Sequence, residues 1–179
     1  RQCVTMLRPS LSVSVMNGHR SRIFALKFHP ENGNQFISGG WDNTVQFWNV
    51  NQEHAVRRIY GPHICGDSLQ IDPITNQILT GSWRKDQSLE IWDYFSGAKI
   101  LDVPPDYWGH SLTYSCHWLG TEHIVAGGTR PGMCRLIERT AMTTVGRLVN
   151  LPKGIHCTDV TCPLFSRPLI AATSAHHIY

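Results

Sequence analysis

Short hydrophobic runs alternate with clusters of turn-forming residues along the chain, most clearly in residues 18–50. Within this stretch, three strand-prone runs occupy residues 23–28, 35–38 and 44–48. Clusters rich in Pro, Gly, Asn and Asp separate these runs, as in an antiparallel meander. No run has the length and the period of an amphipathic helix. The pattern therefore predicts an all-β fold made of short strands.

The features of this stretch return later in the chain at a constant spacing. The two matched Trp residues are 44 positions apart, and in both units the Trp follows a His by 29 positions and an Asp by six. The matched positions are His19, Ser38, Asp42 and Trp48 in the first unit, and His63, Thr80, Asp86 and Trp92 in the second. Repeats of about 40 to 45 residues with a Gly-His start and a Trp-Asp end are typical of the WD-repeat (WD40) family, which this sequence resembles.

The resemblance implies a WD40-type β-propeller, built from four-stranded antiparallel blades. We expect residues 1–179 to form a single propeller region, with the tail of a preceding blade at 1–17 and repeats at 18–60, 61–108, 109–150 and 151–179, the last one truncated. Residues 10–16 suit the outer strand of the preceding blade. Because propellers usually have about 4 to 8 blades, we expect an incomplete propeller of about four repeats. Open blade edges would then favour self-association.

The third and fourth units keep the period and lose the signature residues. In the third unit, Ile137 stands at the Trp position, Ala126 at the hydroxyl position and Pro131 at the Asp position. The fourth unit carries Ala171 and Ala175 at the hydroxyl and Asp positions. For these two units the fold prediction rests on the period and the apolar pattern.

Composition and charge narrow the classes of partner. The chain has 41% hydrophobic residues and a net charge of +3, and its Lys and Arg residues are scattered, so we expect no nucleic-acid partner. No stretch approaches the roughly 18 apolar residues of a membrane span, so we expect no membrane insertion. The six cysteines form no Cys-x-x-Cys pair, and several fall in apolar strands. Reduced cysteines favour an intracellular setting, cytoplasmic or nuclear.

A catalytic and a structural interpretation compete for the matched His, hydroxyl, Asp and Trp positions. The resemblance implies the structural one, in which the His bridges the Asp and the hydroxyl and the hydroxyl accepts the indole N–H. The donors and acceptors of these groups balance. A triad repeated with a threonine nucleophile in one copy is less plausible than a repeated structural fastening. We therefore expect no catalytic residue, and the absence of zinc, Walker and dinucleotide motifs predicts no metal and no cofactor.

Recognition is the function that the resemblance implies. Family members bind proteins and peptides at the rim of the central channel, at the start of each first strand and at the turn before the structural Asp. The corresponding positions here are Arg22, Phe24, Trp41, Asp67, Lys85, Tyr114 and Arg130. Arg and exposed aromatic residues are typical of binding hot spots. Phe24 and Tyr114 could instead pack under neighbouring loops, because a shift of one residue turns a strand side chain to the other face.

The sequence thus predicts a non-enzymatic scaffold or adaptor for partner proteins or peptides. One alternative is a targeting or substrate-recruitment module of a larger multidomain protein that carries an enzymatic or trafficking activity. A second alternative is a propeller enzyme with its site in the channel, which would require a polar or metal-liganding cluster at the rim. The rim positions hold a mixed aromatic and basic set instead.

Overall fold

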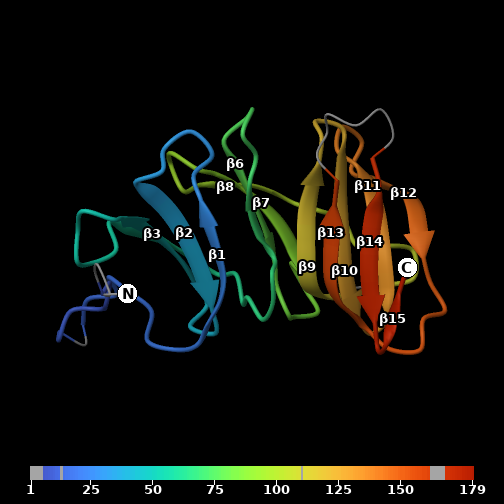
Figure 1. Ribbon diagram of the computed structural model, residues 1–179, viewed down its shortest axis with the longest axis horizontal. Coiled ribbons are helices and arrows are strands. Elements are labelled where there is room, and N and C mark those ends of the chain that lie inside the picture. Colours follow the sequence, from blue (N-terminus) through green and yellow to red (C-terminus); the bar gives the residue numbers. More distant parts are fainter. Residues whose placement is uncertain (1–5, 13, 110, 162–167) are drawn as a thin grey trace.

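The fold is all-β, as the alternating pattern predicts. The computed structural model describes residues 6–12, 14–109, 111–161 and 168–179, and its regular structure consists of 15 strands in four antiparallel sheets. The sheets stand side by side in chain order as the blades of a four-bladed β-propeller (Figure 1). The predicted fold class is therefore confirmed. The described residues contain no helix with the length and apolar character needed to cross a membrane.

Within each sheet, strands that follow one another in the sequence are paired, so each sheet is a meander. The first sheet contains β1 (Ile23–Phe28), β2 (Gln35–Gly40), β3 (Thr44–Asn49) and β4 (Arg57–Tyr60). The second contains β5 (Leu69–Ile71), β6 (Gln77–Gly81), β7 (Leu89–Asp93) and β8 (Lys99–Asp102). The third contains β9 (Leu112–Leu119), β10 (His123–Thr129), β11 (Met133–Glu138) and β12 (Thr143–Leu148). The fourth has three strands, β13 (Ile155–Val160), β14 (Ile170–Ser174) and β15 (His177–Ile178).

The register of the first sheet separates two kinds of side chain. Phe36 pairs with Trp48 and Ile37 pairs with Phe47 across β2 and β3. Because successive side chains point to opposite faces of a strand, Trp48 and Phe47 lie on different faces. Asn43, in the turn between these strands, has a φ of 57°, a left-handed conformation that Asn tolerates. The face of Phe47 packs against the second sheet.

Three buried apolar clusters join successive sheets. The cluster between the first and second sheets includes Ile37, Val45, Phe47, Ile71, Ile78 and Trp92. Leu79, Ile91, Cys116, Ile124 and Ile137 join the second and third sheets, and Val125, Cys134, Ile155 and Ala172 join the third and fourth. Each fully buried aliphatic side chain contributes about 1.5 to 3 kcal/mol through burial. Among the described residues, no such cluster joins the fourth sheet to the first.

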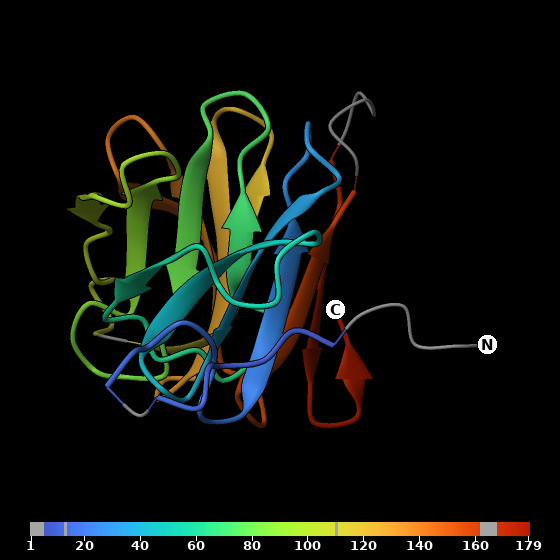
Figure 2. The ribbon, with the colours of Figure 1, turned by 90° about the vertical axis from the view of Figure 1, so that its left-hand side faces the viewer.

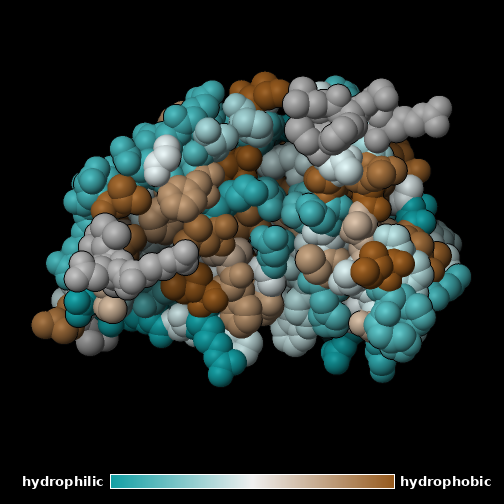
Figure 3. All heavy atoms as spheres, in the orientation of Figure 1, coloured by the Kyte–Doolittle hydropathy of each residue, from teal (hydrophilic) through white to brown (hydrophobic). Residues whose placement is uncertain are grey.

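The face of the first sheet that points away from the second is partly uncovered. Leu26 and Phe28 are each 51% exposed on this face, although Phe28 contacts the buried Phe36 at a ring-centroid distance of 5.3 Å. Figure 3 shows hydrophobic side chains gathered over the region of this sheet. We call Leu26 and Phe28 the open face of the first sheet.

The segment before β1 is irregular, which differs from the outer strand predicted at residues 10–16. Its described part contains no strand, and Figure 2, which looks onto the first sheet, shows it looping beside the sheet. The Arg20 guanidinium donates hydrogen bonds to the carbonyl oxygens of Ser10, Ser12 and Val15. In a strand these carbonyls would accept hydrogen bonds from a neighbouring strand, whereas here all three accept from the Arg20 side chain. Cys3, His110 and Cys162 lie outside the described residues.

Candidate functional site

The first sheet carries a closed set of hydrogen bonds at four of the matched positions. His19 bridges Asp42 and Ser38, with 2.8 Å between Nδ1 and Asp42 Oδ2 and 2.8 Å between Nε2 and Ser38 Oγ. The indole N–H of Trp48 donates to Ser38 Oγ at 2.7 Å. Because Ser38 accepts from Trp48, its own proton is available to His19 Nε2, and the His19 proton then lies on Nδ1, facing Asp42.

Electrostatics stabilise the carboxylate of this set. Burial alone would raise the pKa of Asp42, but hydrogen bonds from His19 and Thr44 outweigh burial and hold the pKa below its usual range. Ser38 is fully buried and His19 is only 9% exposed. The arrangement therefore leaves no reactive group open to a substrate and acts as a fastening between the β2–β3 hairpin and the chain before β1.

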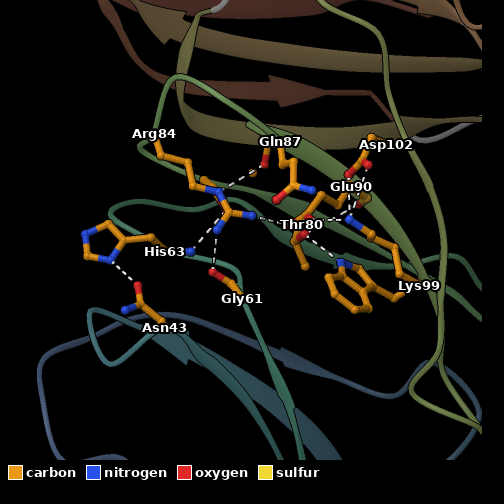
Figure 4. A network of polar contacts seen from close by, with 12 residues as sticks. Asn43, Gly61, His63, Thr80, Arg84, Gln87, Glu90, Lys99 and Asp102 are labelled. Carbon is orange, nitrogen blue, oxygen red and sulfur yellow. Dashed lines mark hydrogen bonds and ion pairs between the residues drawn. The ribbon is translucent and has the colours of Figure 1, made fainter.

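The second sheet brings together only two of its four matched residues. The Trp92 indole N–H donates to Thr80 Oγ1 at 3.1 Å (Figure 4). His63 does not reach them; its Nδ1 lies 2.7 Å from Asn43 Oδ1, in the first sheet's β2–β3 turn. Asp86 is exposed in the turn between β6 and β7, and the structure gives it no hydrogen bond to a described residue. The second unit has two more residues between its hydroxyl position and its Trp than the first unit, and this extra length carries Asp86 outward.

In the second unit, Arg84 and not His63 links the chain before the first strand to the buried side chains of the sheet. The Arg84 guanidinium donates to the Gly61 carbonyl at 2.8 Å, to the Gln87 carbonyl at 3.3 Å and to Glu90 Oε2 at 3.1 Å (Figure 4). Lys99 Nζ approaches Glu90 Oε1 at 3.4 Å. The sequence pattern predicted no role for Arg84 or Glu90.

Glu90 is a buried carboxylate at a position where the first sheet has an amide. Glu90 pairs with Thr80 as Gln46 pairs with Ser38, and both residues are at most 1% exposed. Burial raises the pKa of Glu90, and the positive charges of Arg84 and Lys99 offset only part of this effect. The folded protein therefore favours the protonated form of Glu90 more than the unfolded chain does.

Replacing Glu90 with Gln tests this shift. Glutamate titrates near pH 4.3 in unfolded chains. Because the folded pKa is raised, the contribution of Glu90 to stability is fully present below about pH 4.3 and is lost as the pH rises through the folded value. We therefore expect the free energy of unfolding of the wild type, relative to Glu90→Gln, to increase as the pH is lowered. Urea titrations at a series of pH values measure this difference.

Asp42→Asn provides a control of opposite sign for the Glu90 experiment. The lowered pKa of Asp42 means that its contribution is present above the unfolded value of about 3.9 and is lost as the pH falls through the folded value. The wild type should therefore lose stability relative to Asp42→Asn on acidification. Parallel pH profiles for the two variants would contradict the opposite shifts.

The third sheet uses an ion cluster where its signature residues are missing. Asp106, in the connection before β9, accepts from Arg147 Nε at 3.0 Å and 2.8 Å, and it lies 3.7 Å from Arg135 Nε. Burial alone would raise the pKa of Asp106, but the Trp108 N–H and Arg147 hold it below its usual range. Arg135 lies in β11 at the position of Gln46 and Glu90 in the first two sheets. Because a buried charge needs a counter-charge, Arg135 at this position could have indicated from the sequence that a carboxylate lies nearby.

Aromatic rings form a row across the end of the sheets where β1, β5, β9 and β13 begin. This aromatic row consists of Phe24, Trp41, His63, Trp83, Tyr114 and His156. Ring centroids are 5.4 Å apart for Phe24 and Trp41, 6.3 Å for Trp41 and His63, 6.4 Å for Trp83 and Tyr114, and 4.8 Å for Tyr114 and His156. The backbone N–H of Trp83 donates a hydrogen bond to the backbone carbonyl of His63. This bond joins the first three residues of the row to the last three.

The exposed centre of the row is in the first sheet. Trp41 is 43% exposed and Phe24 38% exposed, and the Arg22 guanidinium lies 5.4 Å from the Trp41 ring centroid. The Trp41 indole N–H also donates to Cys65 Sγ at 2.9 Å, which orients the ring. Phe24 and Tyr114 thus pack against other rings of the row. The sequence predicted neither His63, Trp83 nor His156 here.

The remaining predicted rim residues surround the row as charged groups. Asp67, Lys85 and Arg130 are all exposed. Lys85 and Arg130 lie in the turns between the second and third strands of their sheets, and Asp67 precedes β5. The structure gives none of the three an ion pair with another described residue.

Metal and thiol chemistry have little basis in the described residues. Within them, no three His, Cys, Asp or Glu side chains gather in a way that could hold a metal ion. Cys65, Cys116, Cys134 and Cys157 are free thiols. Burial raises the pKa of Cys134 to about 11, so this thiol stays protonated near neutral pH.

Comparison with known proteins relates the chain to WD repeats. Residues 10–49 match the family described as WD domain, G-beta repeat. An uncharacterised WD repeat-containing protein of Schizosaccharomyces pombe is 29% identical over 104 residues, which cover 56% of this chain and 26% of that protein. Guanine nucleotide-binding protein subunit beta-1 of Nicotiana tabacum is 26% identical over 111 residues, which cover 59% of this chain and 28% of that protein. The chain thus matches about a quarter of the length of each relative.

Proposed function

We propose that this chain, a WD-repeat β-propeller whose residues 10–49 match the WD domain, G-beta repeat family, is a non-enzymatic scaffold or adaptor that binds a partner protein or peptide across the aromatic row. Propellers of this family commonly serve as protein-interaction scaffolds. The observation that supports the proposal is the contact between exposed Phe24, exposed Trp41 and Arg22 at one end of the sheets. Aromatic and Arg side chains supply much of the energy in protein interfaces.

Pre-ordering of the row supports a binding role. Trp41 is held by His63, Arg22 and the Cys65 thiol before any partner arrives. A ring that is already oriented loses little side-chain entropy on binding, so more of the contact energy is available for affinity.

Charge around the row favours an acidic segment in the partner. The exposed cations Arg22, Lys85, Arg130 and Lys153 lie in the turns and strand starts around the row, and the exposed carboxylates in these segments are Asp67 and Asp86. Positive charge at a rim increases association rates with acidic partners and makes them sensitive to salt. The free thiols support an intracellular location, cytoplasmic or nuclear. The open face of the first sheet supports self-association as an additional property.

Replacing Trp41 with Ala tests the proposed function. Truncation of a central aromatic anchor costs about 2 kcal/mol or more of binding free energy, so affinity for the partner should fall by about thirtyfold. Quantitative affinity capture with the wild-type chain identifies candidate partners, and calorimetric titration of each purified partner measures the affinity.

Phe95→Ala is the matched control for this experiment. Phe95 is 69% exposed in the turn between β7 and β8, outside the aromatic row. This variant should bind each partner as the wild type does. If the partners bind Trp41→Ala and Phe95→Ala equally well, the aromatic row is not their binding site.

A further inference from the structure

The sequence contains two Asn-Gly pairs, and the structure places them in opposite environments. Asn32 and Gly33 lie in the turn that connects β1 to β2 (Figure 1), and both residues are exposed. A β-carbon built on Gly33 would meet no atom within 4 Å. Asn17 is partly buried and Gly18 is buried, and a β-carbon built on Gly18 would lie 2.7 Å from the backbone nitrogen of Pro9. The first of these pairs is therefore open to solvent, whereas the second is packed against the chain.

Hydrogen bonds direct the two asparagine side chains differently. The backbone N–H of Asn34 donates to Asn32 Oδ1 at 3.0 Å, which makes an Asx turn. Such a turn folds the side-chain amide over the peptide group that follows, here that of Gly33. The Asn17 side chain instead accepts a hydrogen bond at 3.0 Å from the N–H of Ser10, seven positions earlier. The amide of Asn32 therefore faces the next peptide group, and the amide of Asn17 faces a distant part of the chain.

This geometry favours a reaction between the Asn32 side chain and the Gly33 backbone. The Gly33 nitrogen, which no β-carbon shields, attacks the side-chain carbonyl carbon of Asn32, and a C–N bond forms. The Asn34 N–H already donates to the oxygen of that carbonyl, so it stabilises the negative charge that develops there. The bond from this carbon to the side-chain nitrogen then breaks. The side-chain nitrogen leaves as ammonia, together with the proton of the Gly33 N–H, and a cyclic succinimide remains.

Water opens the succinimide without any change in oxidation state. Its hydroxyl group adds to one of the two ring carbonyl carbons, the bond from that carbon to the ring nitrogen breaks, and the other water proton passes to this nitrogen. Opening at the side-chain carbonyl gives aspartate, and opening at the main-chain carbonyl gives isoaspartate. Either product is a carboxylate at neutral pH, so the net charge of +3 falls by one.

We propose that Asn32 is a site of spontaneous deamidation, with water as the co-reactant, and that the fold protects Asn17 from the same reaction. The backbone carbonyl of Asn32 accepts a hydrogen bond from the Gln35 N–H at 3.0 Å, and the aspartate product keeps this bond. In the isoaspartate product that carbonyl becomes part of the free carboxylate, and the backbone runs through the former side chain. The turn is then longer by one atom, which loosens the pairing of β1 with β2. The reaction therefore marks older molecules with a charged β1–β2 turn.

Incubation of the 179-residue chain in water labelled with heavy oxygen tests the proposal. Samples are taken over several weeks at mildly alkaline pH, digested in ordinary water and sequenced by tandem mass spectrometry. Asn32 should convert, and its products should carry heavy oxygen from the water. Conversion at Asn17 should be at least about tenfold slower, because the hydrogen bonds that it accepts from the N–H groups of Ser10 and Ala55 must open first.

Two comparisons separate the effect of the fold from that of the Asn-Gly pair itself. In urea, where the fold is lost, Asn32 and Asn17 should convert at similar rates. Gly33→Ala adds a methyl group that hinders the attacking nitrogen, so Asn32 should stay intact over the period in which half of the wild type converts. The substitution fits the turn, because Gly33 has no left-handed φ and its β-carbon meets no neighbour. The melting temperature of this variant should therefore not fall.

The rates in the folded and unfolded chain decide between the outcomes. Faster conversion of Asn32 than of Asn17 in the folded chain, with similar rates in urea, supports the proposal. If Asn32 converts in urea alone, the turn protects this residue and the proposal is wrong. Equal rates at the two residues in the folded chain would overturn the protection of Asn17, and products without heavy oxygen would overturn the reaction with water.

Discussion

Replacing Asp106 with Ala is expected to lower the free energy of unfolding by about 3 kcal/mol. The Asp106 side chain has no exposed surface, and it accepts two hydrogen bonds from Arg147 and faces Arg135. Arg135 is only 7% exposed, so the variant leaves a buried guanidinium without its counter-charge. Chemical denaturation at neutral pH, followed by tryptophan fluorescence, measures the loss.

An exposed ion pair provides the control for the Asp106 experiment. Arg8 and Glu53 approach to 3.7 Å with more than half of each side chain exposed. Because solvent screens such pairs, Glu53→Ala should change the free energy of unfolding by less than about 1 kcal/mol. Equal losses for Asp106→Ala and Glu53→Ala would show that the buried cluster contributes no more than a surface pair.

Replacing His19 with Ala is expected to cost about 3 kcal/mol as well. The variant leaves the buried Ser38 hydroxyl without its acceptor, which costs about 1 to 3 kcal/mol, and it removes the His19 hydrogen bond to the Asp42 carboxylate, which keeps its bonds from Thr44 and the Arg20 N–H. Ser38 would still accept from Trp48, but its own proton would find no acceptor. Urea unfolding followed by circular dichroism provides the measurement.

His63→Ala is the matched variant in the second unit. His63 occupies the same sequence position as His19, yet it bonds through its ring to Asn43 alone and is only partly buried. Its loss should cost at most about 1 kcal/mol. A large and equal loss for both histidines would mean that His63 fastens its sheet as His19 does, contrary to the geometry.

The period of the sequence was sufficient for the fold because each sheet is a local meander. Strand-prone runs predicted at residues 23–28 and 44–48 agree with β1 and β3 within one residue. Even the third sheet, which lacks the signature Trp, forms four strands, because the short apolar runs of β10 and β11 and the turn between them are intact. Local patterning therefore specifies the strands without the signature side chains.

Side-chain partners were harder to predict, because they depend on turn length and on neighbouring sheets. The distance from Asp86 to Trp92 matched the first unit, but two residues inserted after Thr80 moved Asp86 into solvent and Arg84 inward. Trp83 and His156 join the aromatic row from different sheets, so no local pattern links them. The pairing of Asp106 with Arg147 spans 41 residues and shows no periodicity.

The arrangement of the sheets also determines how independently the sequence of each blade can evolve. Each apolar cluster involves only two successive sheets, so a substitution inside one sheet is felt mainly by the sheets beside it. One blade can therefore keep a histidine fastening, the next an arginine and the third an ion cluster, without mutual interference. Gene duplication of a unit likewise adds one interface and preserves the existing ones. Diversity among the blades is a physical consequence of nearest-neighbour packing.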